Sequence, residues 1–123
     1  MTASDGWTIP KGMTRPHPRA YGTFPRKLRK FVLDENLMPM ALAIRSMTSL
    51  PAEKFKIRDR GVLKTGNIAD IVVFNMKTIA DRSTYLEPHQ YAEGIVYLLM
   101  GGVPVIEKSE ATGKRMGLPL CRA

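Results

Sequence analysis

Residue types that could carry out chemistry are few in this chain and widely spaced. His17 and His89 are the only histidines, and 72 positions separate them. The sequence contains no H-x-H, H-E-x-x-H or C-x-x-C pattern of zinc ligands, no G-x-S-x-G nucleophile elbow, no P-loop and no G-x-G-x-x-G loop. Asp5, within a Ser-Asp-Gly run, has the residue types of an ordinary turn. The residues alone therefore predict no complete catalytic set.

Length and composition indicate one globular domain. The chain has 123 residues, of which 44% are hydrophobic and 24% charged. No apolar run approaches the roughly 20 residues that span a bilayer, and the first residues lack the apolar core of a signal peptide. The single cysteine, Cys121, cannot form a disulfide within the chain. We therefore expect a cytoplasmic protein with no membrane partner.

The net charge of +8 raises the possibility of an anionic partner. Residues 1–60 hold most of it, with twelve Lys or Arg against five Asp or Glu, including the basic run at residues 26–30 (RKLRK). One hypothesis is therefore a small nucleic-acid-binding protein. Against it, aromatic residues make up only 7% of the chain and no nucleic-acid-binding motif is present. A basic run beside an apolar stripe is usually a solvated helix face, so we expect no nucleic-acid partner.

Helices are predicted in the first half of the chain. Residues 1–22 are rich in Pro and Gly and indicate a loop. Thr23 is then the expected N-cap of a helix that has Pro25 in its first turn and runs to about Asn36. Apolar spacing predicts a second helix from about Pro39, and Ser49 is the expected cap of a short third helix.

Strands are predicted in the second half. Residues 68–74 (IADIVVF) form an apolar, β-branched run that indicates a buried strand. Two further runs, 95–100 and 103–107, are joined by Gly101 and Gly102, the residue types of a type I′ turn, which predicts a β-hairpin at residues 95–107. The tail after Ser109 is expected to be irregular. Helices followed by strands indicate either an α+β architecture or two part-domains in succession, and we expect α+β.

Several segments, in order along nearly the whole chain, resemble the C-terminal region of N-acyl-D-amino-acid deacylases (D-aminoacylases), a branch of the amidohydrolase superfamily. The most specific is residues 17–25 (HPRAYGTFP). Residues 66–74 (GNIADIVVF) are similar to a stretch common across the superfamily. The other segments are SDG at 4–6, MTSLPA at 47–52, DRGV at 59–62, DR at 81–82, PHQY at 88–91 and EGI at 93–95.

The resemblance implies a fold context. Amidohydrolases are (β/α)₈ barrels with a small β-domain built from both chain ends, and their active sites lie at the C-terminal ends of the barrel strands. A whole barrel takes about 250 residues, which is more than this chain contains. Residues 1–60 would be the C-terminal end of the barrel, as a loop plus its last helices. Residues 61–123 would be part of the composite β-domain and the tail.

The resemblance also implies site residues. Asp5 would be the catalytic aspartate at the end of the last barrel strand, which takes a proton from water and passes it to the leaving amine. Arg19 would bind the substrate's α-carboxylate through its planar guanidinium. His17 would line the same pocket. The alternatives are a simple turn for Asp5, a surface arginine for Arg19, and a loop histidine that hydrogen-bonds backbone for His17. Asp70 is expected to have a structural role.

Under this interpretation the complete enzyme is a zinc-dependent hydrolase that cleaves the amide bond of N-acyl-D-amino acids. The zinc ligands would lie upstream of Met1, so we expect this chain to bind no metal and to be inactive alone. Its partner would then be the upstream barrel segment, or a second copy through self-association, because its apolar faces and strand edges would otherwise be exposed. A non-catalytic assembly fragment is the alternative.

Overall fold

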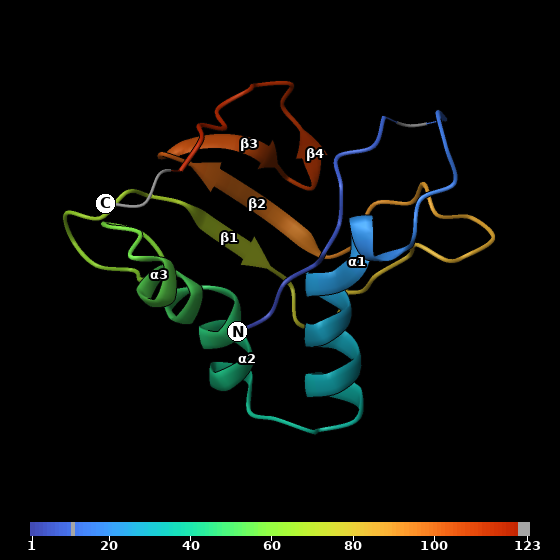
Figure 1. The fold of residues 1–123 in the computed structure, drawn as a ribbon, viewed down its shortest axis with the longest axis horizontal. Helices are drawn as coiled ribbons and strands as arrows, with labels where there is room; N and C mark the ends of the chain where they lie inside the picture. The colour runs from blue at the N-terminus through green and yellow to red at the C-terminus, as the bar shows by residue number, and fades with distance from the viewer. Residues whose placement is uncertain (11, 121–123) are drawn as a thin grey trace.

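A layer of helices packs beside an antiparallel sheet (Figure 1). The computed structural model describes residues 1–10 and 12–120, so Cys121 lies outside the described residues. This mixture of helix and antiparallel sheet confirms the predicted α+β class. The elements in chain order are α1 (Arg19–Arg26), the π-helix η1 (Lys27–Asp34), α2 (Met40–Met47), α3 (Ser49–Phe55), β1 (Ile71–Phe74), β2 (Ile95–Met100), β3 (Val103–Glu107) and β4 (Glu110–Ala111).

The first helix begins four residues before the predicted N-cap. Pro18 precedes the first turn with φ −50° and ψ −25°, a conformation that leads directly into a helix. The predicted cap Thr23 instead lies inside α1, where its hydroxyl donates to the carbonyl of Arg19 at 2.9 Å. Pro25 also lies inside the helix. Proline has no backbone N–H, which breaks the regular ladder, and the π-helical segment η1 follows at Lys27.

The second and third helices lie close to their predicted positions. Pro39 precedes α2 as expected, whereas α3 begins at Ser49 with Thr48 in the cap position. The predicted cap is therefore the first helical residue, a displacement of one position. None of the helices within the described residues is long and apolar enough to cross a membrane.

The four strands form an antiparallel sheet in the order β1-β2-β3-β4. Gly101 and Gly102 join β2 to β3 with φ values of 57° and 83°, which confirms the predicted hairpin and its type I′ turn. The tail is less irregular than expected, because Glu110–Ala111 pairs with β3 as the short strand β4.

The prediction of a buried strand at residues 68–74 was wrong in extent and in burial. Strand β1 begins only at Ile71, and Val72 and Val73 are 50% and 44% exposed. Phe74 packs against the helical core, but the sheet edge at β1 has no neighbouring strand among the described residues. The run has the composition of a fully covered strand, but its two central residues stay about half exposed.

The core is small for the length of the chain. The buried apolar side chains come from η1, the helices α2 and α3 and the segment after β1, and they are Leu28, Val32, Ala43, Ala52 and Ile79. The accessible surface is 9056 Å², compared with about 6,600 Å² expected for a compact monomer of 13.8 kDa. The fold therefore leaves considerably more surface in water than an independent domain of this mass does.

Gly94 lets two segments meet in this core. It has φ +81°, and a Cβ there would lie 2.5 Å from both the Cα and the N of Ile79, the largest fully buried side chain. We predict that Gly94→Ala lowers the free energy of unfolding by about 1–3 kcal/mol more than Gly66→Ala does. Gly66 is a matched control, because its φ is +92° and a Cβ there has nothing within 4 Å. Urea denaturation of both variants measures the difference, and equal losses would show that only backbone strain matters at Gly94.

Candidate functional site

The structure brings together two of the three predicted site residues. Nη2 of Arg19 lies 2.9 Å from Oδ2 of Asp5. Arg19 comes from the first turn of α1 and Asp5 from the irregular segment before it. Both side chains remain accessible, 43% and 78% exposed respectively, so neither is committed to the core.

A close backbone contact places Asp5 beside Arg19. Asp5 has φ +49°, and the amide of Gly6 donates to the hydroxyl of Ser4 at 3.1 Å, although this irregular segment forms no regular backbone turn. A Cβ on Gly6 would lie 2.9 Å from the Cα of Ala20. Only glycine allows this segment to lie so close to α1. The catalytic role of Asp5 stays a prediction.

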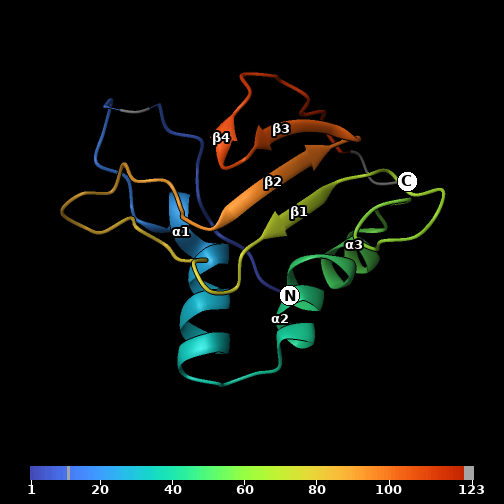
Figure 2. The same cartoon turned by 180° about the vertical axis from the view of Figure 1, so that it is seen from behind.

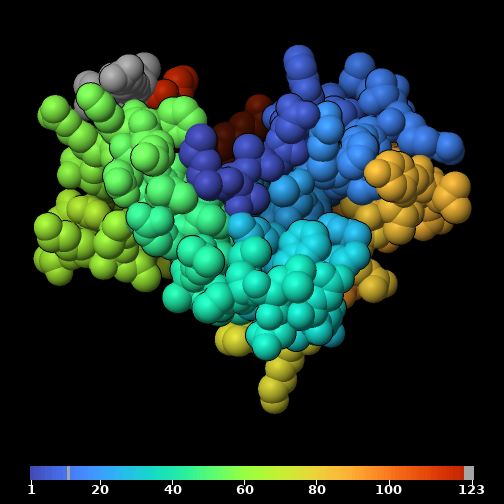
Figure 3. Space-filling view, turned by 60° about the horizontal axis from the view of Figure 1, so that its bottom comes forward, coloured from blue at the N-terminus to red at the C-terminus, as the bar shows by residue number. Residues whose placement is uncertain are grey.

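The start of the chain is anchored between the helices. The amide of Thr2 donates to the carbonyl of Ser46 at 2.8 Å, and the ammonium of Lys27 donates to the hydroxyls of Thr2 and, at 2.6 Å, of Ser46. Figures 1 and 2 both show this segment running between α1 and α2, and Figure 3 shows it exposed in a hollow between them. This role of Lys27 was missed, because the sequence placed Lys27 only in a solvated basic run.

His17 is hydrogen-bonded through both ring nitrogens. Its Nδ1 accepts from the amide of Arg19 at 3.0 Å, and its Nε2 lies 3.0 Å from the hydroxyl of Tyr85. Because a backbone N–H can only donate, Nδ1 is the acceptor and Nε2 carries the proton that is donated to Tyr85. The imidazole therefore supplies the acceptor at the start of α1 that a capping side chain would otherwise provide.

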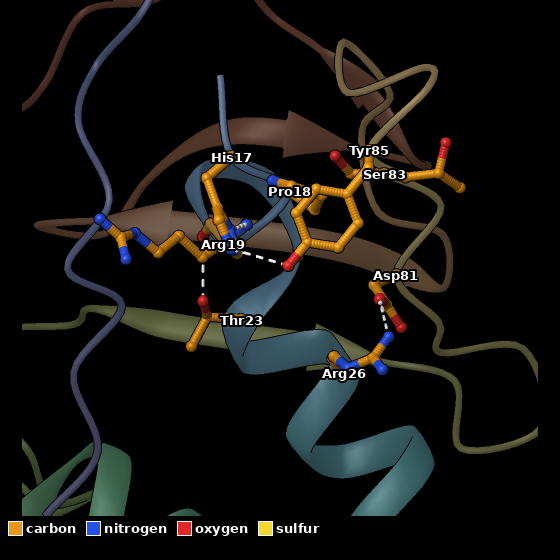
Figure 4. Close-up of a pocket in the computed structure, with 10 residues that line it drawn as sticks. His17, Pro18, Arg19, Thr23, Arg26, Asp81, Ser83 and Tyr85 are labelled. Atoms are coloured by element: carbon orange, nitrogen blue, oxygen red, sulfur yellow. Dashed lines mark hydrogen bonds and ion pairs between the residues drawn. The ribbon is translucent and has the colours of Figure 1, made fainter. Parts of the chain in front are cut away.

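A cavity of approximately 380 Å³ lies between the first turns of α1 and residues 81–85 (Figure 4). His17, Arg19 and Tyr85 are among the residues that line it. An ion pair between Arg26 and Asp81, 3.0 Å long, is also part of its lining. The structure thus places His17 on the wall of a pocket beside Arg19, but with its ring nitrogens already engaged.

Asp70 has a structural environment, as expected. Its Oδ1 accepts from the amide of Gly101 at 2.8 Å, and its Oδ2 pairs with the guanidinium of Arg60. The carboxylate thereby holds the β2–β3 turn against the chain before β1.

The described residues offer no metal-ligand cluster of their own. Among residues 1–10 and 12–120, no group of three or more His, Cys, Asp or Glu is arranged to hold a metal ion. The carboxylate of Asp5 has a cation partner in Arg19.

Comparisons of sequence and of structure both find amidohydrolases similar to this chain. A model of the amidohydrolase family matches residues 1–106. A D-aminoacylase from Alcaligenes xylosoxydans xylosoxydans is 41% identical over 122 residues, which cover 99% of this chain and 25% of that protein. The chain thus spans about a quarter of the length of this relative.

Two solved structures are similar in fold and sequence. A crystal structure of D-aminoacylase aligns with a TM-score of 0.84 and 42% identity, over 88% of this chain and 23% of that one. An N-acyl-D-glutamate deacylase from Bordetella bronchiseptica, complexed with zinc and a phosphonate inhibitor, aligns with a TM-score of 0.79 and 44% identity, over 89% and 23%.

The environments of Asp5 and Asp70 predict different effects of the same substitution on stability. Asp70→Asn weakens an ion pair and a hydrogen bond to a turn amide, and we expect it to lower the free energy of unfolding by about 1–2 kcal/mol. Asp5→Asn removes one charge from an exposed pair and should leave this free energy unchanged. Chemical denaturation of the two variants tests this, and a large loss from Asp5→Asn would show that Asp5 serves the fold.

Proposed function

The chain belongs to the amidohydrolase family, and we propose that it is the C-terminal portion of a zinc-dependent enzyme that hydrolyses the amide bond of N-acyl-D-amino acids. The observation that supports this best is the 2.9 Å contact between Asp5 and Arg19. It juxtaposes a group that can transfer protons with a group that can bind a carboxylate. The relatives named as D-aminoacylase and N-acyl-D-glutamate deacylase give the reaction class.

Arg19 is proposed to bind the α-carboxylate of the substrate. Its guanidinium carries five N–H donors, and in the free chain it already pairs with a carboxylate, that of Asp5. An ion pair this exposed contributes only about 0–1 kcal/mol, so a substrate carboxylate can replace it at little cost. The free energy lost with Asp5 is regained with the substrate, and Asp5 becomes available for the reaction.

Asp5 is proposed to move the proton. Oδ2 would accept a proton from the attacking water and then deliver it to the nitrogen of the leaving amine, a transfer worth about 10²–10⁴-fold in rate. Zinc held by the rest of the enzyme would supply a water with a pKa of about 7. Arg19, beside Asp5, would hold the substrate so that its amide lies within reach of this carboxylate.

The proposal assigns residues 1–60 to the end of the barrel and residues 61–123 to the composite β-domain. The large accessible surface and the half-exposed Val72 and Val73 on β1 support the proposal that another part of the enzyme covers this chain. Strand β1 also has an edge without a partner among the described residues, and such an edge accepts a further strand. The rest of the barrel is the proposed complement, and self-association is the alternative cover for the same surfaces.

The same exposed surface favours the second candidate, a non-catalytic assembly fragment that buries its apolar faces against another chain. Nucleic-acid binding gains no such support. In the basic run, Arg26 and Arg29 pair with carboxylates at 3.0 Å and Lys27 bonds to hydroxyls, so these residues have partners within the chain.

Activity should require both this chain and the part of the D-aminoacylase relative that it does not cover. We predict hydrolysis of N-acetyl-D-leucine, with zinc present, by the co-expressed pair and none by this chain alone. In the pair, Asp5→Asn should lower kcat by at least about 10²-fold, because the amide cannot carry the proton. Asp59→Asn is the matched control, since Asp59 is an exposed loop aspartate with a similar φ of 56°.

Two results would contradict the proposal. If Asp5→Asn and Asp59→Asn are equally active in the assembled pair, Asp5 does not carry the proton. If the two parts assemble with bound zinc but the wild-type pair does not hydrolyse the substrate, the assembly-fragment alternative is favoured instead.

A further inference from the structure

A compact loop packs onto the turn that carries Arg19. Residues 81–92 leave and return through an antiparallel bridge between Ala80 and Glu93, with N–O distances of 3.3 and 2.9 Å. Inside the loop the buried hydroxyl of Ser83 donates to the carbonyl of Pro88 at 2.6 Å. A loop closed at its base and bonded across its interior keeps a defined shape.

His89 joins this loop to two points near Arg19. Its Nε2 lies 2.6 Å from the carbonyl of Thr14, and its Nδ1 lies 3.0 Å from the hydroxyl of Tyr21. A carbonyl can only accept, so Nε2 carries the proton, and in the neutral ring Nδ1 then accepts from the Tyr21 hydroxyl. The half-buried imidazole thus bridges the segment before α1 and the helix itself.

A second histidine–tyrosine pair also joins the start of α1 to the loop of residues 81–92. Here the histidine, His17, belongs to the turn, and the tyrosine, Tyr85, belongs to the loop, with a ring-centroid distance of 5.1 Å and the 3.0 Å hydrogen bond described above. His17 precedes Arg19 by two residues, and Tyr21 follows it by two. The backbone that carries Arg19 is therefore tied to one loop on both sides.

A third contact brings the start of the loop against α1. A Cβ on Gly22 would lie 2.8 Å from the Cβ of Asp81, so glycine is needed for this approach. The side chain of Asp81 is only 15% exposed and pairs with Arg26. Figure 4 shows Asp81 and Tyr85 facing the helix from the loop side.

The exposed ion pair cannot supply this positional control. A contact as accessible as that between Arg19 and Asp5 has too little free energy to fix a long side chain. The orientation of the guanidinium must therefore come from the backbone of the first turn of α1 and from what holds that turn.

We infer that His89 is a positioning residue: through Tyr21 and Thr14 it sets the first turn of α1, and thereby the direction in which Arg19 meets the substrate carboxylate. This inference rests on the proposed carboxylate-binding role of Arg19. It assigns the loop of residues 81–92, far from Arg19 in sequence, a function in substrate orientation.

The first test uses the chain itself. Hydrogen exchange is measured at the amides of Ala20, Tyr21 and Gly22, which bond to the carbonyls of His17 and Pro18. We expect exchange about tenfold faster in His89→Ala and about threefold to tenfold faster in Tyr21→Phe, which loses only the hydroxyl. Tyr97→Phe, the same change on β2, is the matched control and should leave these rates unaltered. Unchanged rates in both His89→Ala and Tyr21→Phe would overturn the inference.

The second test uses the pair formed with the uncovered part of the D-aminoacylase relative. For N-acetyl-D-leucine we expect His89→Ala to raise KM about tenfold with kcat changed less than about twofold, because the lost interaction orients the bound carboxylate. For N-acetyl-D-leucinamide, which has no carboxylate, kcat/KM should not change. His89→Gln, whose amide can still donate to Thr14, should recover part of the loss.

Equal losses on the two substrates would overturn the inference, because they would show general damage to the fold. Absence of hydrolysis by the wild-type pair would count against the proposed function alone. In that case the exchange rates of the first turn still decide whether His89 holds it.

Discussion

The arrangement of this site depends on how the first turn of α1 is held. The central contact, between Arg19 and Asp5, is exposed on both sides and too weak to impose a geometry. The turn is instead fixed from outside the helix. His17 supplies an acceptor for the amide of Arg19, and the loop of residues 81–92 contacts the residues on either side. A weak, exchangeable ion pair on a firmly held backbone suits the proposed role of Arg19, in which it releases one carboxylate and binds another.

Asp5 is positioned by a different device. The chain before it is fastened to α2 through Thr2 and Ser46, and Lys27 donates to both hydroxyls from η1. Gly6 then allows the segment that carries Asp5 to touch the helix at Ala20. Two independent anchors therefore converge on one point, one through the start of the chain and one through the 81–92 loop. Each anchor uses residues distant in sequence from the side chain it places.

The sequence predicted the features that depend on neighbouring residues and missed those that depend on contacts between distant segments. The β2–β3 hairpin was predictable because its signal, two glycines between apolar runs, is local. The start of α1 was not, because its acceptor comes from a histidine before Pro18 and not from a usual capping residue. The burial of β1 was predicted wrongly. Its apolar composition is that of a strand packed on both faces, but Val72 and Val73 are about half exposed in the described residues. The contact between Tyr21 and His89 spans 68 positions, and no periodicity encodes it. Asp5 and Arg19 were found only through the family resemblance.

Under the proposed function, Asp5 faces the metal of a hydrolase whose remaining parts lie outside this chain. The most direct test is the position of zinc, located by anomalous scattering in crystals of the chain assembled with the complementary part of its D-aminoacylase relative. We expect a zinc ion within about 5 Å of the Asp5 carboxylate, the span of one metal-bound water and one hydrogen bond. Zinc located well beyond that distance, with Asp5 still paired only to Arg19, would contradict it.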